Sequence, residues 1–225
     1  MIPLRDVIPS RTTPYITVTI IALNAIAWIY EISMPDPRAL NRFLFLYGVV
    51  PAAFAPATLI TSMFLHGSWS HVIGNMWYLW IFGDNVEDRV GHGRFLVFYL
   101  LCGIAAALGQ VLMDPDSVAP MVGASGAIAG VMGAYFVLYP HSRVLTLIPI
   151  IFFIQIVEIP AIFLLGVWFL MQFINAGAVA ATAAARSSGG VAFAAHVVGF
   201  VAGAVGIFVF RRRDRDYWDR REYYA

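Results

Sequence analysis

The chain has 225 residues, of which 60% are hydrophobic and only 12% are charged. A typical soluble domain is about half apolar and about a quarter charged, so this composition excludes an ordinary soluble protein and indicates an integral membrane protein. Cys102 is the only cysteine, which excludes an internal disulfide framework and a cysteine-rich metal site. The net charge of +1 excludes a strongly basic nucleic-acid-binding protein.

Six mostly apolar segments predict six membrane-spanning helices, because a helix needs about 20 apolar residues to cross a bilayer. They are residues 13–32, 69–85, 95–113, 125–139, 159–182 and 191–210. The first is interpreted as a retained span, since no small-residue cleavage site follows it. We therefore expect an all-α polytopic membrane protein with one six-helix domain, residues 1–210, and a charged cytoplasmic tail, residues 211–225.

Two further apolar segments are unsuited to a regular span. Residues 35–68 are predicted to form a long, partly apolar loop at or in the membrane interface. Residues 144–157 are short and contain Pro149, so they form either an interfacial strand or an extension of the fifth span.

Arginine positions predict which side of the membrane each segment occupies. With six spans and the N-terminus inside, eleven arginines lie on the cytoplasmic side, six of them between Arg211 and Arg221. The outer side holds Arg38, Arg42 and Arg186. This asymmetry obeys the positive-inside rule and predicts that both termini are cytoplasmic.

Polar side chains in these apolar surroundings are informative, because they cost free energy in hydrocarbon unless they are paired or line a wet cavity. They are His66, His71, Asn75, Ser125 and His196. Ser125 lies in the sequence GASG at the start of the fourth span, where unpaired backbone N–H groups can stabilise an oxyanion. This motif by itself favours the alternative, a helix cap or a small-residue packing site.

The sixth span presents one face of small residues beside a histidine. His196 shares this face with Gly199, Gly203 and Gly206. The fourth span has a matching face of Gly126, Gly130 and Gly133. Close packing of the two faces would bring Ser125 and His196 together near the outer ends of their helices. A structural hydrogen bond is the alternative role for His196, but the pair favours a catalytic dyad.

The second span carries His71 and Asn75 four residues apart, hence on one helical face. Both side chains can donate hydrogen bonds, as an oxyanion hole requires. A metal or haem pair is the alternative, disfavoured because the chain has no HExxH motif and asparagine is a poor zinc ligand. We expect no metal and no cofactor, and a structural hydrogen-bonding role for His66.

Other polar positions receive simpler interpretations. Trp168 and Gln172 lie four residues apart in the fifth span and are expected to serve packing or a helix contact. Asp114 and Asp116 are placed on the outer side but in a loop, so no carboxylate is an obvious partner for His196. A dyad is therefore expected rather than a triad.

Three segments together resemble the rhomboid family of intramembrane serine proteases, in their bacterial form. They are TSMFLHGSWSHVIGN at 61–75, GASG at 123–126 and AHVVGFVAG at 195–203. The start of the chain, MIPLRD, and FGDNVEDRVG at 82–91 are also similar to bacterial rhomboids.

The resemblance implies a six-helix bundle around a water-filled cavity below the outer surface. It implies that Ser125 is the nucleophile and His196 the general base, with an oxyanion hole made by His71, Asn75 and the Ser125 backbone N–H. Gly123 would shape the adjoining loop, and the fifth span would be the mobile substrate gate. Supporting positions are His66, Gly126, Gly199 and Gly203.

One position departs from part of the family. Some members carry an aromatic residue four positions after the nucleophile, packed against the catalytic histidine, where this chain has Ala129. Phe193, Phe200 or Trp80 are the candidates to orient His196 instead.

The resemblance implies a serine endopeptidase of a bacterial inner (plasma) membrane that cleaves transmembrane segments of other proteins. Its expected partners are those substrates and membrane lipids, with no nucleic acid, and the sequence does not determine an oligomeric state. Two alternatives stay open: a catalytically inactive rhomboid-like protein that binds membrane clients, and a transporter that uses the buried polar residues as a pathway.

Overall fold

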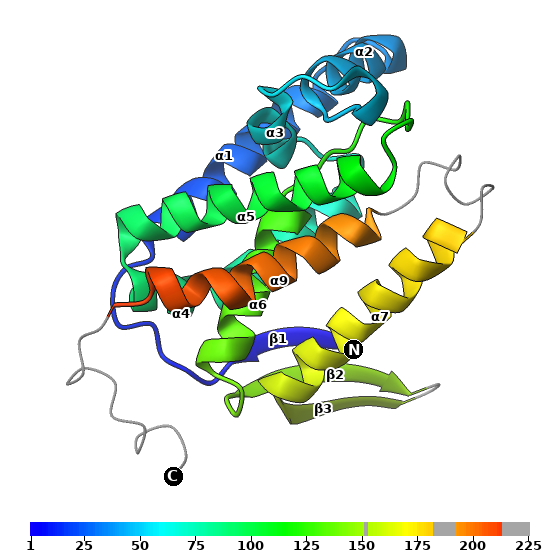
Figure 1. Cartoon of the computed structure of the whole chain (residues 1–225). Coiled ribbons are helices and arrows are strands. Elements are labelled where there is room, and N and C mark those ends of the chain that lie inside the picture. Colours follow the sequence, from blue (N-terminus) through cyan, green and yellow to red (C-terminus); the bar gives the residue numbers. More distant parts are fainter. Residues whose placement is uncertain (151–152, 182–191, 213–225) are drawn as a thin grey trace.

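The structure is a computed structural model that describes residues 1–150, 153–181 and 192–212 (Figure 1). Outside these ranges lie Arg186, the ends of the fifth and sixth predicted spans at residues 182 and 191, and the tail from 213 onward. Residue 192 is the first one described after residues 182–191. Within the described ranges the chain is mainly helical, which confirms the predicted fold class.

Six long helices occupy the predicted spans. They are α1 (Tyr15–Ile32), α4 (Trp69–Val90), α5 (His92–Met113), α6 (Ser125–Leu138), α7 (Ala161–Ala181) and α9 (Phe193–Phe210). Among the described residues, 4 helices are long and apolar enough to cross a membrane, namely α1, α5, α7 and α9. Helix α6 is equally apolar but shorter, and the second half of α4 carries charged side chains that lower its hydropathy.

Helix α6 is the centre of the bundle. Its residues are buried without interruption from Gly126 to Tyr135, and it packs against α9, α5 and α4 (Figure 1). Such all-round burial explains why α6 is uniformly apolar and rich in small residues. Helix α7 lies at the periphery, mostly exposed, and packs mainly against α9.

A three-stranded antiparallel sheet lies at the end of α6 opposite Ser125 (Figure 1). Its strands are β1 (Ile2–Asp6), β2 (Arg143–Ile150) and β3 (Phe153–Pro160), in the order β1-β2-β3. Of the two interpretations of residues 144–157, the strand is therefore the one that the described part of this segment adopts, and α7 begins only at Ala161. Alternate burial of Val144 and Thr146 is the two-residue period that a strand produces. Strand β1 was not predicted from the sequence.

The segment before α4 is more regular than the predicted loop. It contains α2 (Pro37–Tyr47), η1 (Pro51–Ala53), α3 (Thr58–Thr61) and η2 (Ser62–Phe64). Asp36 starts α2 because its side chain accepts hydrogen bonds from two backbone N–H groups of the first turn. At the other end, the Ser62 carbonyl accepts the Gly123 N–H at 2.9 Å. This hydrogen bond fixes the segment against the approach to Ser125.

Candidate active site

Ser125 is the first residue of α6 and is half-buried. The chain enters this helix through Gly123, whose φ of 125° is a conformation that side chains with a Cβ rarely adopt. A Cβ on Gly123 would also lie 2.7 Å from two atoms of the His71 ring. Glycine is therefore required here both for the backbone turn and for the approach of α4.

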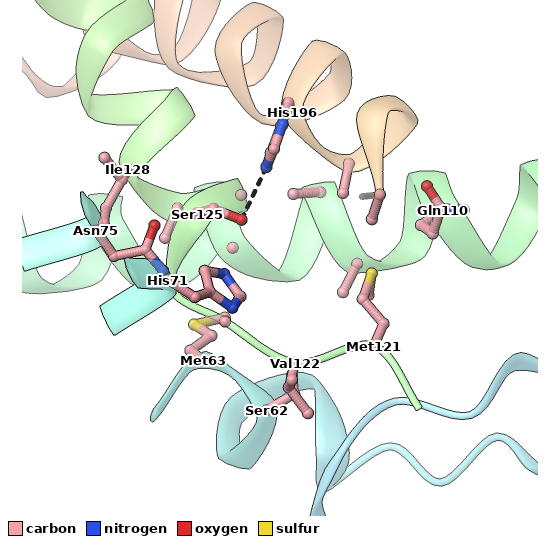
Figure 2. Close-up of a pocket in the computed structure, with 18 of the residues that line it drawn as sticks. Ser62, Met63, His71, Asn75, Gln110, Met121, Val122, Ser125, Ile128 and His196 are labelled. Carbon is pink, nitrogen blue, oxygen red and sulfur yellow. Dashed lines mark hydrogen bonds between the residues drawn. The ribbon is translucent and has the colours of Figure 1, made fainter. Parts of the chain in front are cut away.

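His196 lies in the first turn of α9 and faces the serine. Its Nε2 atom is 2.8 Å from Ser125 Oγ, a hydrogen bond between residues 71 positions apart (Figure 2). The sequence singled out both residues, and the fold brings their reactive atoms into direct contact. This distance is the one that proton transfer from a serine hydroxyl to an imidazole requires.

Glycine packing between α6 and α9 sets this distance. A Cβ on Gly199 would lie 2.2 Å from the Gly126 carbonyl oxygen, and one on Gly203 would lie 1.8 Å from that of Gly130. Real side chains do not tolerate either separation, so the two backbones are in contact. The ends of the two helices that carry Ser125 and His196 are held together as a consequence.

Helix α4 supplies two polar side chains beside the serine. Ser68 begins this helix by accepting the His71 N–H at 3.2 Å, and His71 and Asn75 follow on one face. In Figure 2 the two side chains lie near Ser125, on the side away from His196. The serine is thus placed between a histidine of α9 and two potential hydrogen-bond donors of α4.

His66 holds this arrangement from the loop before α4. It is 1% exposed, its backbone N–H donates to the Glu31 carboxylate, and its Nε2 lies 2.9 Å from Asn75 Nδ2. Burial and the neighbouring His71 imidazole lower the pKa of His66 to about 3. The neutral ring therefore accepts one N–H of Asn75 and leaves the second N–H for another acceptor.

A cavity of about 1000 Å³ surrounds these groups, and Ser125, His196, His71 and Asn75 all line it. Its walls combine backbone and small apolar residues with a few convergent polar groups, which is typical of a substrate site. Within residues 1–150, 153–181 and 192–212, no three His, Cys, Asp or Glu side chains lie close enough together to hold a metal ion.

Two residues of α7 complete the surroundings of the histidine. Gln172 Oε1 lies 2.9 Å from His196 Nδ1, and the Trp168 ring centroid lies 5.8 Å from the imidazole. Both were expected from the sequence to serve packing or a helix contact, and neither was associated with His196. Gln172 is a polar side chain in an apolar span, so the cost of a polar group in hydrocarbon, which singles out the other five polar residues, applies to it too.

The residues proposed to orient His196 lie elsewhere or act indirectly. Trp80 is 58% exposed on α4. Phe193 lines the cavity, and the Phe200 ring packs against Trp168. Among the described residues, Trp168 of α7 is the aromatic side chain that the fold places beside the imidazole, where Ala129 of α6 provides none.

Comparisons with known proteins identify the family to which the chain is similar. The rhomboid domain model matches residues 54–213. The chain is 35% identical to "Rhomboid-like protein 11, chloroplastic" of Arabidopsis thaliana over 114 residues, which are 48% of this chain and 39% of the relative. It is 33% identical to "Putative rhomboid protease YdcA" of Bacillus subtilis (strain 168) over 128 residues, 56% of this chain and 62% of the relative.

A third relative is "Rhomboid protease GluP" of the same bacterium, 41% identical over 76 residues, which are 34% of this chain and 14% of the relative. The chain thus spans less than two thirds of the length of each of these relatives. The rhomboid domain itself, however, covers most of the chain and all the residues of the Ser125–His196 site. With its apolar helices, this is a membrane protein, and it belongs to the rhomboid family.

Proposed function

We propose that this protein is an intramembrane serine endopeptidase that cleaves transmembrane segments of other proteins with a Ser125–His196 dyad. The observation that carries the proposal is the 2.8 Å contact between Ser125 Oγ and His196 Nε2 beside a cavity. A serine hydroxyl is a weak nucleophile unless an adjacent base takes its proton, and this contact supplies the base.

In the proposed reaction, Ser125 Oγ attacks the carbonyl carbon of the scissile peptide bond while its proton passes to His196 Nε2. The carbonyl oxygen becomes an oxyanion, and donors from His71, Asn75 and the Ser125 backbone N–H stabilise it. His196 then gives its proton to the departing amine, leaving an acyl-enzyme. A water molecule, activated by the same imidazole, hydrolyses the ester and regenerates Ser125.

The substrate class follows from the location of the site. A peptide bond inside a bilayer helix is already hydrogen-bonded to its own helix, so the helix must unwind before attack. Glycine or proline near the cleaved bond makes unwinding easier, because both weaken helices. We therefore infer a preference for substrates with such residues and with a small residue at the cleaved bond.

The membrane arrangement is part of the same proposal. We infer a bacterial plasma-membrane protein with both termini cytoplasmic, residues 1–210 as the catalytic membrane domain and residues 211–225 as a cytoplasmic tail. Arginines favour the cytoplasmic side for the sheet end of α6, which leaves Ser125 toward the outer face. Plant and bacterial relatives share the domain, so the membrane is inferred from the topology and not from any one relative.

Fluorophosphonate labelling of the purified protein in detergent and in lipid tests the proposal. Wild type is expected to become covalently labelled, whereas Ser125→Ala and His196→Ala are not, because one lacks the nucleophile and the other its base. Ser33→Ala, an exposed serine at the end of α1, is the matched control and retains labelling.

Two results would contradict the dyad. A folded wild type that stays unlabelled in lipid would favour the client-binding alternative, and equal labelling of Ser125→Ala would assign the nucleophile to another residue. Cleavage of a reconstituted transmembrane substrate, absent in Ser125→Ala, then distinguishes a protease from a reactive but non-proteolytic serine.

A further inference from the structure

The catalytic histidine is held from a third helix, and both contacts come from one face of α7. Trp168 and Gln172 are four residues apart, so their side chains lie one above the other along the helix. Gln172 Oε1 is 2.9 Å from His196 Nδ1, and the Trp168 ring lies 5.8 Å from the imidazole at a tilt of 37°. The hydrogen bond to Gln172 fixes one ring nitrogen of His196, and the contact with Trp168 fixes the plane of the ring.

The hydrogen bond selects the tautomer that the proposed reaction requires. An amide oxygen only accepts hydrogen bonds, so His196 Nδ1 must carry the ring proton to donate to Gln172 Oε1. The hydrogen bond made by one imidazole nitrogen decides which form the other takes. Nε2 is then unprotonated and free to accept the hydroxyl proton of Ser125.

Charged groups around His196 do not offer a substitute for this acceptor. The described sequences of α6, α7 and α9 contain no Asp, Glu, Arg or second histidine. Among the described residues across the cavity, the titratable or charged side chains that line it are His71 and Tyr78 of α4 and Asp114 at the end of α5. His196 Nδ1 instead donates its hydrogen bond to the neutral amide of Gln172.

The aromatic contact occupies a place that α6 leaves open. Ala129, one turn after Ser125, is fully buried and provides no ring. Trp168 packs beside His196 and also against Phe200, one turn further along α9. Helix α7 therefore supplies both the hydrogen-bond acceptor and the ring contact that keep the imidazole in place.

We propose that Gln172 is the positioning residue of His196, so that α7 sets the tautomer and orientation of the base. This inference rests on the proposed Ser125–His196 dyad. Gln172 does not touch the scissile bond; it acts through the imidazole. Because α7 is peripheral and packs mainly on α9, the base is aligned only while α7 stays against α9. A shift of α7 by a few ångströms would break the 2.9 Å hydrogen bond.

The test is the second-order rate of fluorophosphonate inactivation as a function of pH. Gln172→Leu and Gln172→Met, which remove the acceptor, are expected to slow inactivation about tenfold to a hundredfold, less than the roughly 10⁴-fold loss when an orienting carboxylate is altered in a serine protease. Gln155→Leu makes the same chemical change on exposed β3 and is the control, with unchanged rate.

Gln172→Glu supplies the readout that distinguishes positioning from packing. A carboxylate again accepts from Nδ1–H, so most of the rate returns, and its charge stabilises the imidazolium. Because His196 then loses its proton only at higher pH, the acid limb of the pH–rate profile shifts to higher pH. Melting temperatures of all variants in the same detergent identify any that fail to fold.

The outcomes separate this inference from the proposed function. An unlabelled wild type contradicts the dyad itself. A labelled wild type with Gln172→Leu and Gln172→Met reacting at the wild-type rate leaves the dyad standing and overturns the role of Gln172. A folded Gln172→Glu that is as slow as Gln172→Leu, with an unmoved acid limb, also overturns it, because a purely steric role would give that result.

Discussion

Gly203 of α9 lies directly against Gly130 of α6, so closely that a Cβ on Gly203 would stand 1.8 Å from the Gly130 carbonyl oxygen. The atoms that such a Cβ would meet belong to the backbone of Gly130 in the buried centre of the bundle. A backbone has no alternative rotamer that would let it move away. The same close backbone contact between α6 and α9 is repeated one helical turn away, at Gly199 and Gly126. It ends at Ser125 and His196. Contact between two helix backbones thus determines the spacing of the two reactive side chains.

Gly203→Ala is accordingly expected to destabilise the protein by about 1–3 kcal/mol, the usual cost of forcing an extra carbon into a filled core. Gly206→Ala is the matched control on the same helix, since its Cβ would meet Phe98 at an ordinary 3.5 Å. That control should be neutral or slightly stabilising, because alanine favours helices more than glycine does. Thermal or denaturant unfolding in one detergent measures both, and equal stability of the two variants would contradict backbone contact at Gly203.

Gly123→Ala is expected to lower the rate of substrate cleavage more than it lowers the stability of the protein. The new Cβ would lie 2.7 Å from the His71 ring, and the φ of 125° disfavours alanine, so the ring must move away from Ser125. Losing one oxyanion donor costs about 10²–10³-fold in rate in a serine protease, and a loss of this order in cleavage rate is expected.

The measurement for Gly123→Ala is cleavage of a reconstituted transmembrane substrate, with the melting temperature recorded alongside. Gly93→Ala in α5 is the control, because a Cβ there would meet no atom within 4 Å. A Gly123→Ala enzyme with wild-type cleavage would show that the His71 ring does not need its observed position.

The carboxyl group of Asp6, in the sheet, is expected to make the stability of the protein depend on pH. Its carboxylate accepts a hydrogen bond from the Tyr135 hydroxyl at 2.7 Å, and burial raises the pKa of Asp6 from 3.8 to about 6. Between these values the folded protein binds more protons at Asp6 than the unfolded chain does. This contribution to stability is therefore largest near pH 4 and is lost as the pH rises to about 6.

The corresponding experiment compares unfolding of wild type and Asp6→Asn from pH 4 to pH 7. Asparagine cannot titrate, so the stability of wild type relative to Asp6→Asn should fall as the pH rises through this window. Asp116→Asn, at an exposed aspartate, is the control. A constant difference between wild type and Asp6→Asn across the window would show that Asp6 does not titrate as its burial indicates.

Local patterns were sufficient for much of this molecule, and the reason is visible in α6 and α9. A helix repeats every 3.6 residues whatever surrounds it, so spacings of three, four and seven residues are enough to identify the glycine faces and the ends at which Ser125 and His196 lie. Residues 144–157 were ambiguous because a short apolar segment suits a buried strand or a helix equally well. The pairing of β2 with β1 and β3, supported by alternate burial, resolved that ambiguity.

The sequence by itself determined the membrane class, the positions of the long helices and the polar residues that are costly in hydrocarbon, because hydrophobicity and helical period are local properties. The tertiary structure alone decided that Gln172 meets His196 across 24 residues and that Ile2 of the N-terminal strand pairs with Leu147 in the second half of the chain. Such contacts depend on how helices are turned and stacked against one another. That arrangement is set by the packing of the whole bundle, which no short stretch of sequence encodes.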